Sequence, residues 1–201
     1  MTRLSDREFQ AMNSGPRRLL QRQYEFPRLR HMGVTFRGKD VLEIGCGSGY
    51  AAWLIARDAP RSYLGVDVMP EHLELARQRK LPQAKFRLED ATALNSVAAS
   101  SVDLVVVFGI LHHIPEWKRA VGECRRVLRP CGEVYLEEPD GSVLAWFDAR
   151  FHWGHPDQGR FLLPELRAEL ENHGFEILAR ARAFGFGFYR ARRVDPAARA
   201  R

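Results

Sequence analysis

Short apolar runs alternate with amphipathic stretches through the middle of the chain. Four of these runs, at residues 41–44, 63–66, 102–108 and 133–136, are rich in aliphatic and β-branched residues, as buried strands are, and residues 85–89 are predicted to form a further short strand. Between the last two runs, apolar positions recur three and four residues apart from Trp117 to Leu128, which predicts a helix that stops before Pro130. Five strand and helix alternations in a row predict an α/β fold with a doubly wound parallel sheet.

The two ends of the chain extend this pattern. Ser14 and Pro16 predict the start of an N-terminal helix that Pro27 ends or kinks, and residues 1–13 are expected to be mobile. Near the other end, Pro164 predicts the start of a helix that Gly174 closes. Two strands should follow and form a hairpin at the sheet edge. The predicted organisation is a helical lid or cap over 1–36, a single domain over 37–193 with an insertion on the substrate side at 141–161, and a disordered basic tail over 194–201.

Three glycines follow the first predicted strand at alternate positions, as Gly45, Gly47 and Gly49. Glycine permits a positive φ and lets a ligand approach the backbone closely, and the helix that follows offers unpaired N–H groups. The spacing differs from the dinucleotide fingerprint, which places two residues before its last glycine. Glu43 stands two residues before Gly45, where its charge would repel a pyrophosphate. The motif therefore favours a nucleoside that carries a positive group.

Acidic residues close two of the later strands. Asp67 follows the second strand and Asp90 the third, and the fourth strand runs into a segment from Phe108 to His113. The carboxyl ends of parallel strands meet at one edge of the sheet, where ligands collect. Asp67 lies 18 residues beyond Gly49, close to the spacing at which a carboxylate reaches the ribose hydroxyls of a nucleoside. We therefore expect these residues to form one site.

A family resemblance rests on the glycine motif and on the stretches that follow it. The chain resembles the class I S-adenosylmethionine-dependent methyltransferases, in the small-molecule group that includes quinone methyltransferases, over the segments 41–49, 65–67, 89–91, 103–105, 111–114 and 125–132. The resemblance implies a Rossmann-like, mostly parallel seven-stranded sheet with an antiparallel edge hairpin, and S-adenosylmethionine as cofactor. Cys131 departs from the family, which usually has glycine there, and should cause a local adjustment of the turn.

The resemblance also implies roles for individual residues. Asp67 would bind the ribose hydroxyls, Asp90 would accept a hydrogen bond from the adenine amino group, and Val68 would pack on the adenine. The implied cofactor-binding residues are Glu43, Gly45, Cys46, Gly47, Asp67, Val68, Asp90, Ala91, Phe108 and Gly109.

Two histidines beyond the fourth strand are the candidate catalytic residues. His113 is the first choice and His112 the second, because a histidine just beyond the sulfonium could position the acceptor or take its proton. The alternative is a structural loop in which one histidine caps the next helix. A second pair, His152 and His155, has no carboxylate or cysteine at ligand spacing, so we expect no metal site.

Composition limits the partners and the location. Lys and Arg outnumber Asp and Glu by nine to four over residues 1–40 and by seven to one over 180–201, so that both ends are basic. No apolar run is long enough to span a membrane, no secretory signal is recognisable, and the odd count of three cysteines lacks disulfide spacing, so a cytoplasmic location is expected.

The expected function is transfer of a methyl group to a small-molecule or lipid-like acceptor. Nucleic acid is a disfavoured substrate, because the segment after the fourth strand lacks both an Asn/Asp-Pro-Pro-Tyr/Phe motif and a cysteine nucleophile. Peripheral contact of the basic ends with a membrane stays open, as does the oligomeric state. The alternatives are a regulatory protein that binds S-adenosylmethionine without catalysis, and a methyltransferase acting on RNA or protein.

Overall fold

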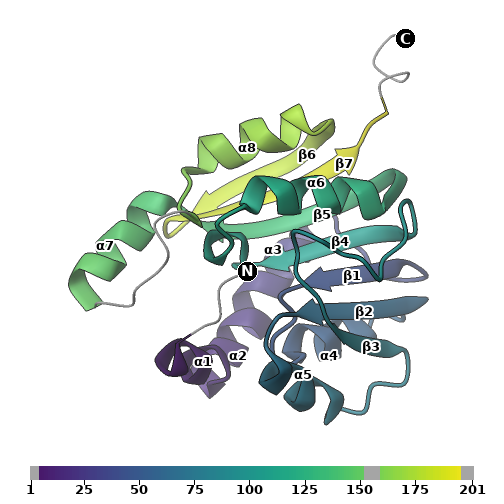
Figure 1. Ribbon diagram of the computed structural model, residues 1–201, viewed down its shortest axis with the longest axis horizontal. Helices are drawn as coiled ribbons and strands as arrows, with labels where there is room; N and C mark the ends of the chain where they lie inside the picture. Colours follow the sequence, from purple (N-terminus) through teal and green to yellow (C-terminus); the bar gives the residue numbers. More distant parts are fainter. Residues whose placement is uncertain (1–4, 152–158, 196–201) are drawn as a thin grey trace.

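A seven-stranded sheet forms the centre of the computed structural model, which describes residues 5–151 and 159–195 (Figure 1). The strand order is β3-β2-β1-β4-β5-β7-β6, and the first five strands are parallel while β7 runs antiparallel to both neighbours. The predicted mostly parallel sheet with an antiparallel edge hairpin is therefore confirmed. The strands are β1 (Asp40–Ile44), β2 (Ser62–Asp67), β3 (Ala84–Leu88), β4 (Val102–Phe108), β5 (Leu128–Pro139), β6 (Phe175–Ala183) and β7 (Phe186–Arg193).

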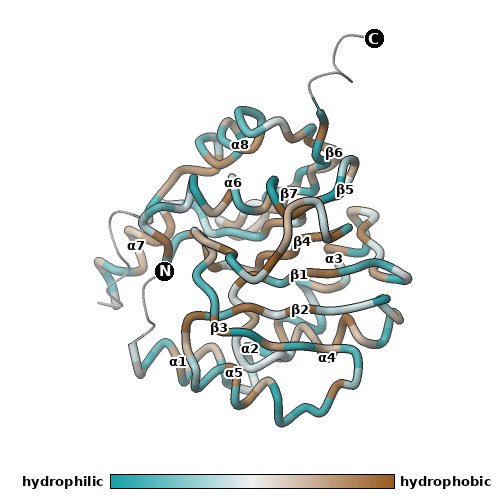
Figure 2. The backbone as a smooth tube through the Cα atoms, turned by 45° about the vertical axis from the view of Figure 1, so that its right-hand side comes forward, coloured by the Kyte–Doolittle hydropathy of each residue, from teal (hydrophilic) through white to brown (hydrophobic). Residues whose placement is uncertain are grey.

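Helices cover both faces of the sheet. α6 (Trp117–Val127) and α8 (Leu163–Asn172) pack on one face, and α3 (Phe26–His31), α4 (Tyr50–Ala56) and α5 (Pro70–Arg77) pack on the other (Figure 1). Successive strand residues point to opposite faces, so Val105 and Val107 join the first core while Leu104 and Val106 join the second. Figure 2 shows hydrophobic residues along the central strands and hydrophilic positions recurring along the helices.

The N-terminal region is helical from residue 6. α1 (Asp6–Met12) begins at a capping box in which the Ser5 hydroxyl and the Glu8 carboxylate each accept a backbone N–H. The expectation of a mobile segment up to residue 13 is thus wrong for residues 6–12, and residues 1–4 lie outside the described part of the chain. The Ser-x-x-Glu spacing of this capping box is the feature of the sequence that indicates the helix.

Pro27 does not end the helical segment in which it lies. α2 (Gly15–Leu20) begins at Ser14, as predicted, and leads through a π-helical turn, η1 (Gln21–Glu25), directly into α3. Proline lacks the N–H group and crowds the preceding turn of an α-helix. The wider π-helical turn just before Pro27 lets the chain continue, since the Phe26 N–H bonds to the Gln21 carbonyl five residues back.

The C-terminal part adds α7 and the edge hairpin. α7 (Gly141–Phe151) follows β5 within the predicted insertion, and residues 152–158, which include His152 and His155, lie outside the described residues. β5 begins at Leu128, five residues before the expected start, and Cys131 within it takes a positive φ of 63°, the adjustment expected for the residue that replaces glycine. Residues 194 and 195 are held in place, since the Val194 N–H bonds to the Gly174 carbonyl, and 196–201 are not described.

None of the helices within the described ranges is long and apolar enough to cross a membrane. Likewise, no group of three or more His, Cys, Asp or Glu side chains suited to a metal ion occurs in residues 5–151 and 159–195.

Candidate active site

The glycine loop lies between the end of β1 and the start of α4, next to the end of β4. Gly45 has a φ of 72°, and a Cβ atom built on it would lie 2.6 Å from Cγ1 of Ile110, which follows β4. Gly47 has a φ of 50°, but its Cβ would meet nothing within 4 Å. Gly45 therefore allows two strand ends to approach, whereas Gly47 leaves open space where a ligand can reach the backbone.

Asp67 ties this loop to the end of β2. Its Oδ2 atom accepts a hydrogen bond from the Gly47 N–H at 2.9 Å, and its Oδ1 atom accepts one from the Met69 N–H at 2.9 Å. The side chain is buried and lies beside His72, whose Nδ1 is 3.4 Å from Oδ2. A carboxylate has about four lone-pair positions, so Asp67 keeps capacity to accept from a diol.

Glu43 lies in β1, two residues before Gly45, and its side chain is also buried. The Tyr63 hydroxyl donates a hydrogen bond to its Oε2 atom. Burial raises the pKa of Glu43 to about 8, against the smaller opposing effect of the Tyr63 bond, and the nearby Asp67 charge raises it further. An approaching cation would favour the ionised form, so Glu43 fits a ligand with a positive group in the way the sequence suggested.

These groups border a cleft of about 70 Å³. It brings together seven of the ten cofactor residues implied by the resemblance, namely Glu43, Gly45, Cys46, Gly47, Asp67, Phe108 and Gly109. The other three, Val68, Asp90 and Ala91, do not line it. Asp90 forms a turn in which its Oδ1 atom accepts from the Thr92 N–H at 2.8 Å, and Ala91 is buried in the core. The cleft also contains Arg17 and Gln21 from the N-terminal helices, which the sequence did not indicate.

A second and larger cavity of about 270 Å³ adjoins the cleft. Most of its wall is apolar and comes from distant segments, with Leu20 in α2, Val143, Leu144 and Phe147 in α7, and Phe186 in β7. The cavity and the cleft share Met12, Arg17, Phe108 and Gly109 in their linings. We call it the acceptor cavity, because it meets the cleft at the residues where the resemblance places the sulfonium.

Both candidate catalytic histidines line the acceptor cavity, in a short turn of 3₁₀ helix, η2 (Leu111–His113). Their ring centroids lie 4.1 Å apart. His112 Nδ1 is 2.9 Å from Glu138 Oε2, and the Glu138 carboxylate also accepts the backbone N–H groups of Ile110 and Leu111 at 2.9 and 2.8 Å. Burial raises the pKa of Glu138 to about 7 despite these bonds. Glu138 therefore fixes the position of the turn and the orientation of the His112 ring.

Sequence reasoning missed four charged residues of the acceptor cavity, namely Glu8, Arg17, Glu25 and Glu137. Arg17 Nη1 donates to Glu25 Oε1 at 2.6 Å, and Glu25 lies against Glu137 at the end of β5. The signal for Glu137 and Glu138 was present, because two acids close a buried parallel strand just as Asp67 and Asp90 do. Nothing in the local sequence marks Glu25 or Arg17, which only the folding of the N-terminal helices brings to the site.

Comparisons with known proteins agree with this geometry. Residues 42–136 match a family described as a methyltransferase domain. A probable S-adenosylmethionine-dependent methyltransferase from Mycolicibacterium smegmatis is 36% identical over 153 residues, which are 76% of this chain and 56% of that protein. A phthiotriol/phenolphthiotriol dimycocerosates methyltransferase from Mycobacterium leprae is 34% identical over 117 residues, 56% of this chain and 43% of that protein. The chain thus spans about half the length of these curated relatives.

The fold is also that of a solved methyltransferase structure. The crystal structure of an S-adenosylmethionine-dependent methyltransferase from Aquifex aeolicus superimposes with a TM-score of 0.76 at 16% identity, covering 96% of this chain and all of that one. S-adenosylmethionine is the cofactor implied by the family, and the open backbone at Gly47 together with Asp67 and Glu43 fits it. Motifs, fold and matches place this chain in the class I S-adenosylmethionine-dependent methyltransferase superfamily.

Proposed function

We propose that this protein transfers the methyl group of S-adenosylmethionine to a small-molecule or lipid-like acceptor. The observation that carries the proposal is the pair of adjoining spaces, a cleft bordered by the glycine loop and an apolar acceptor cavity, which meet at Phe108 and Gly109. A methyl group moves in line from a sulfonium to a nucleophile, so donor and acceptor need adjacent sites from which water is excluded.

The wall of the acceptor cavity supports an apolar acceptor. Leu20, Phe147 and Phe186 come from three separate parts of the chain, and their burial against a ligand would be favourable. The relative from Mycobacterium leprae is named for a lipid-like substrate, which is in keeping with such a cavity. The acceptor of this chain is therefore proposed to have an apolar body.

In this proposal, the seven implied residues that line the cleft bind the cofactor, Val68, Asp90 and Ala91 extend the site toward the adenine as the resemblance implies, and His113 or His112 contacts the acceptor. Each histidine lines the cavity, and the Glu138 contact gives His112 a fixed ring orientation. If Nδ1 of His112 carries the proton shared with Glu138, its Nε2 atom can accept one. Such a group would take a proton from an acceptor hydroxyl as the methyl group arrives.

The surface around the acceptor cavity supports peripheral contact with a membrane. Leu19 and Leu20 in α2, Trp146 in α7 and Phe184 at the hairpin turn are large apolar side chains that are about half or more exposed, Phe184 at 88%. Arg18 and Arg22, also exposed, lie near them along the N-terminal helices. Aromatic and aliphatic side chains beside arginines are typical of surfaces that bind anionic lipid, from which a lipid-like acceptor could enter.

Label transfer tests the proposed function. The protein is incubated with S-adenosylmethionine labelled in its methyl group and with a metabolite or lipid extract, and the products are separated and identified. We expect label in a small molecule or lipid. Tight cofactor binding without any transfer would favour the regulatory alternative, and label found only in RNA or protein would favour a macromolecular substrate.

A further inference from the structure

Two buried carboxyl groups face each other in the wall of the acceptor cavity. Glu25 comes from η1 in the N-terminal helices and Glu137 from the end of β5, and their carboxyl groups lie within hydrogen-bond reach of each other. Their residues are only 2% and 4% exposed, and both line the cavity. Two carboxyl groups in hydrogen-bond contact cannot both be ionised without strong repulsion, so the contact requires a shared proton.

The hydrogen bonds of this pair are incomplete. Arg17 donates to Oε1 of Glu25, but no N–H or O–H group of another described residue reaches Oε2 of Glu25 or Oε2 of Glu137, so the one proton shared by the pair is the only hydrogen available to these two oxygens and leaves some of their lone pairs without a donor. A buried acceptor without a donor costs about 1–3 kcal/mol. Since both carboxyl groups border a cavity, a donor on a ligand can meet this need.

The charges of the cluster favour a neutral donor over a cation. Burial raises the pKa of Glu137 well above its usual range, and the Glu25 charge raises it further; burial likewise raises the pKa of Glu25 against the opposing effect of Arg17. One proton on the pair leaves a single negative charge, which Arg17 balances. A bound cation would require a second carboxylate to ionise in a buried position, whereas a hydroxyl group adds no charge.

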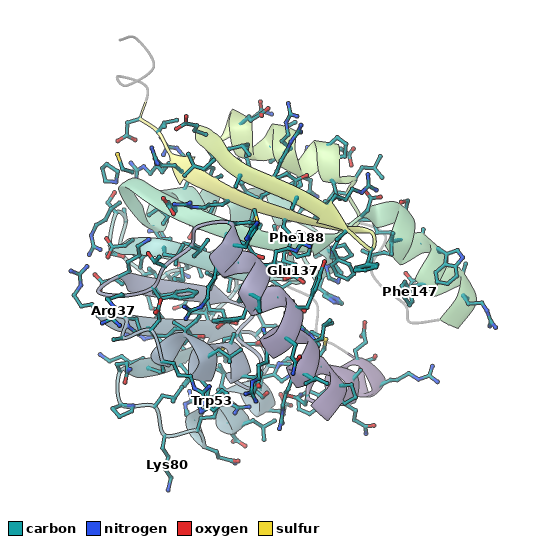
Figure 3. All side chains as sticks on the ribbon, turned by 180° about the vertical axis from the view of Figure 1, so that it is seen from behind. Arg37, Trp53, Lys80, Glu137, Phe147 and Phe188 are labelled. Carbon is teal, nitrogen blue, oxygen red and sulfur yellow. The ribbon has the colours of Figure 1, made fainter. Side chains whose placement is uncertain are left out.

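The pair also lies close to the point where the two sites meet. Glu137 is the β5 partner of Phe108 in the sheet, and its carbonyl accepts a hydrogen bond from the Gly109 N–H at 2.6 Å. Phe108 and Gly109 line both the cleft and the acceptor cavity. Figure 3 shows Glu137 beneath the N-terminal helices and near Phe188.

We propose that Glu25 and Glu137 form a subsite that binds a hydroxyl group of the acceptor within the otherwise apolar cavity. This inference rests on the proposed function only in assigning the cavity to the acceptor. It defines the acceptor class as apolar molecules with a hydroxyl group, and it gives the N-terminal helices a part in recognition, because they supply Glu25.

Two matched probes test the subsite without any turnover. 4-Butylphenol carries a hydroxyl group on an apolar body, and 4-butylanisole has the same body with the hydroxyl hydrogen replaced by methyl. We expect calorimetry on the full chain to show about tenfold tighter binding of the phenol, the effect of one hydrogen bond to a charged group. Equal binding of the two probes, or binding of neither, would overturn the proposal.

Variants assign the preference to the pair. Glu137→Met removes the acceptor but leaves the ion pair between Arg17 and Glu25, and should reduce the tenfold preference to threefold or less. Glu137→Gln keeps a hydrogen-bond acceptor and should retain more of it. Glu74→Gln, an exposed position on α5 away from both cavities, is the matched control and should leave the preference unchanged. A full preference in Glu137→Met would instead assign hydroxyl binding to the histidines.

A spectroscopic measurement keeps the test valid if Glu137→Met fails to fold. In protein labelled with ¹³C at the glutamate carboxyl groups, the pair should give a signal that titrates above the usual glutamate range and is absent from Glu137→Gln. Addition of 4-butylphenol should shift that signal, and 4-butylanisole should not. Absence of such a signal, or equal shifts with both probes, would overturn the proposal. Failure of methyl transfer with these results intact would refute the proposed function alone.

Discussion

The cleft of the glycine loop and the acceptor cavity are built in different ways. Seven of the sixteen residues that line the cleft come from two short segments, Gly45 to Ala51 and the end of β2, with Asp67 joined directly to the Gly47 N–H. The acceptor cavity instead combines side chains from α2, β4, α7 and β7, which are more than 150 residues apart in sequence at their extremes. One site depends on backbone geometry and the other on the meeting of distant side chains.

This difference explains why the cofactor can be inferred when the acceptor cannot. Glycine spacing and a carboxylate at a strand end are local features that any chain with this chemistry must keep. The shape of an apolar cavity can be made from many combinations of side chains, because hydrophobic contact is not directional. If the comparison holds, changes in the cleft should reduce cofactor affinity, and changes in the acceptor cavity should reduce turnover or acceptor binding.

The largest expected effect is on turnover, from the histidines. His112→Ala and His113→Ala are made separately, and the variant that lacks the base should lose about 100-fold or more in kcat, the usual range for general base catalysis. Affinity for S-adenosylhomocysteine should stay within about twofold, because the histidines line only the acceptor cavity. Single-turnover rates and calorimetry measure the two quantities. Equal losses in both would show that the histidines act structurally.

Loss of the Asp67 carboxylate should weaken the cofactor next most strongly. Asp67→Ala removes the acceptor for the ribose and frees the N–H groups of Gly47 and Met69, so S-adenosylhomocysteine should bind about 100-fold more weakly. Asp67→Asn keeps one acceptor oxygen and should be intermediate. Calorimetry compares both variants with Glu74→Gln as control. Unchanged affinity in Asp67→Ala would contradict the placement of the nucleoside at this loop.

Two glycine variants should separate folding from binding within the cleft. Gly45→Ala places a Cβ atom against Ile110 and should lower the melting temperature by several degrees, about 1–2 kcal/mol of stability. Gly47→Ala points into open space, so it should lower cofactor affinity about tenfold with a smaller change in melting temperature. Differential scanning fluorimetry and calorimetry give both values. The comparison fails if Gly47→Ala destabilises the fold as much as Gly45→Ala does.

The pH dependence of cofactor binding should follow Glu43. Burial holds its pKa near 8 in the folded chain, so the carboxyl group is mostly protonated at neutral pH. The positive groups of the cofactor favour the ionised form, and binding should therefore release a proton. Affinity for S-adenosylmethionine should rise several-fold from pH 6.5 to 8 and level off above, while Glu43→Gln should bind with a flatter profile. A profile that falls over this range in the wild type would reverse the assignment.

The same raised pKa affects stability in the absence of cofactor. The pKa of Glu43 is about 8 in the folded chain and 4.5 in the unfolded chain. Binding of a proton to Glu43 therefore stabilises the folded chain, and this contribution is complete below pH 4.5. That contribution is lost as the pH rises through 8, and the pKa of about 7 at Glu138 acts in the same direction. The chain without cofactor should therefore melt at a lower temperature at pH 8.5 than at pH 6, and less so in the Glu43→Gln variant.

The smallest expected effect concerns the surface around the acceptor cavity. Leu19→Ser with Phe184→Ser should reduce binding to vesicles containing anionic phospholipid by about three- to tenfold, because exposed apolar area is lost. Cofactor affinity should not change. Co-sedimentation with anionic and neutral vesicles measures the effect, and Leu88→Ser, an exposed leucine on β3, is the control. Equal binding of all variants would remove the argument for membrane contact.

Much of the fold could be read from periodicity. The run at residues 102–108 is apolar on both faces apart from Asp103, as a buried strand is, and β4 lies beside β1 at the centre of the sheet. The predictions from local sequence were wrong where the tertiary structure allows a conformation that the local residues do not indicate. Proline usually interrupts a helix, but the π-helical turn before Pro27 lets the helical segment continue. The predicted start of β5 is five residues too late, because residues 128–132 are typical of a turn when their local sequence is considered alone.

For the candidate site, the sequence by itself predicted the residues proposed to bind the nucleoside. The glycines, Glu43 and Asp67 are marked by backbone geometry and by charge, and both features can be recognised within a few residues. Only the tertiary structure decided which groups line the acceptor cavity. Glu25 and Arg17 lie in an amphipathic helical region with no local sign of function, and they reach Glu137 because α3 packs on the sheet through Phe26 and Leu29. A contact between groups 112 residues apart depends on the packing of the whole core, which no short pattern records.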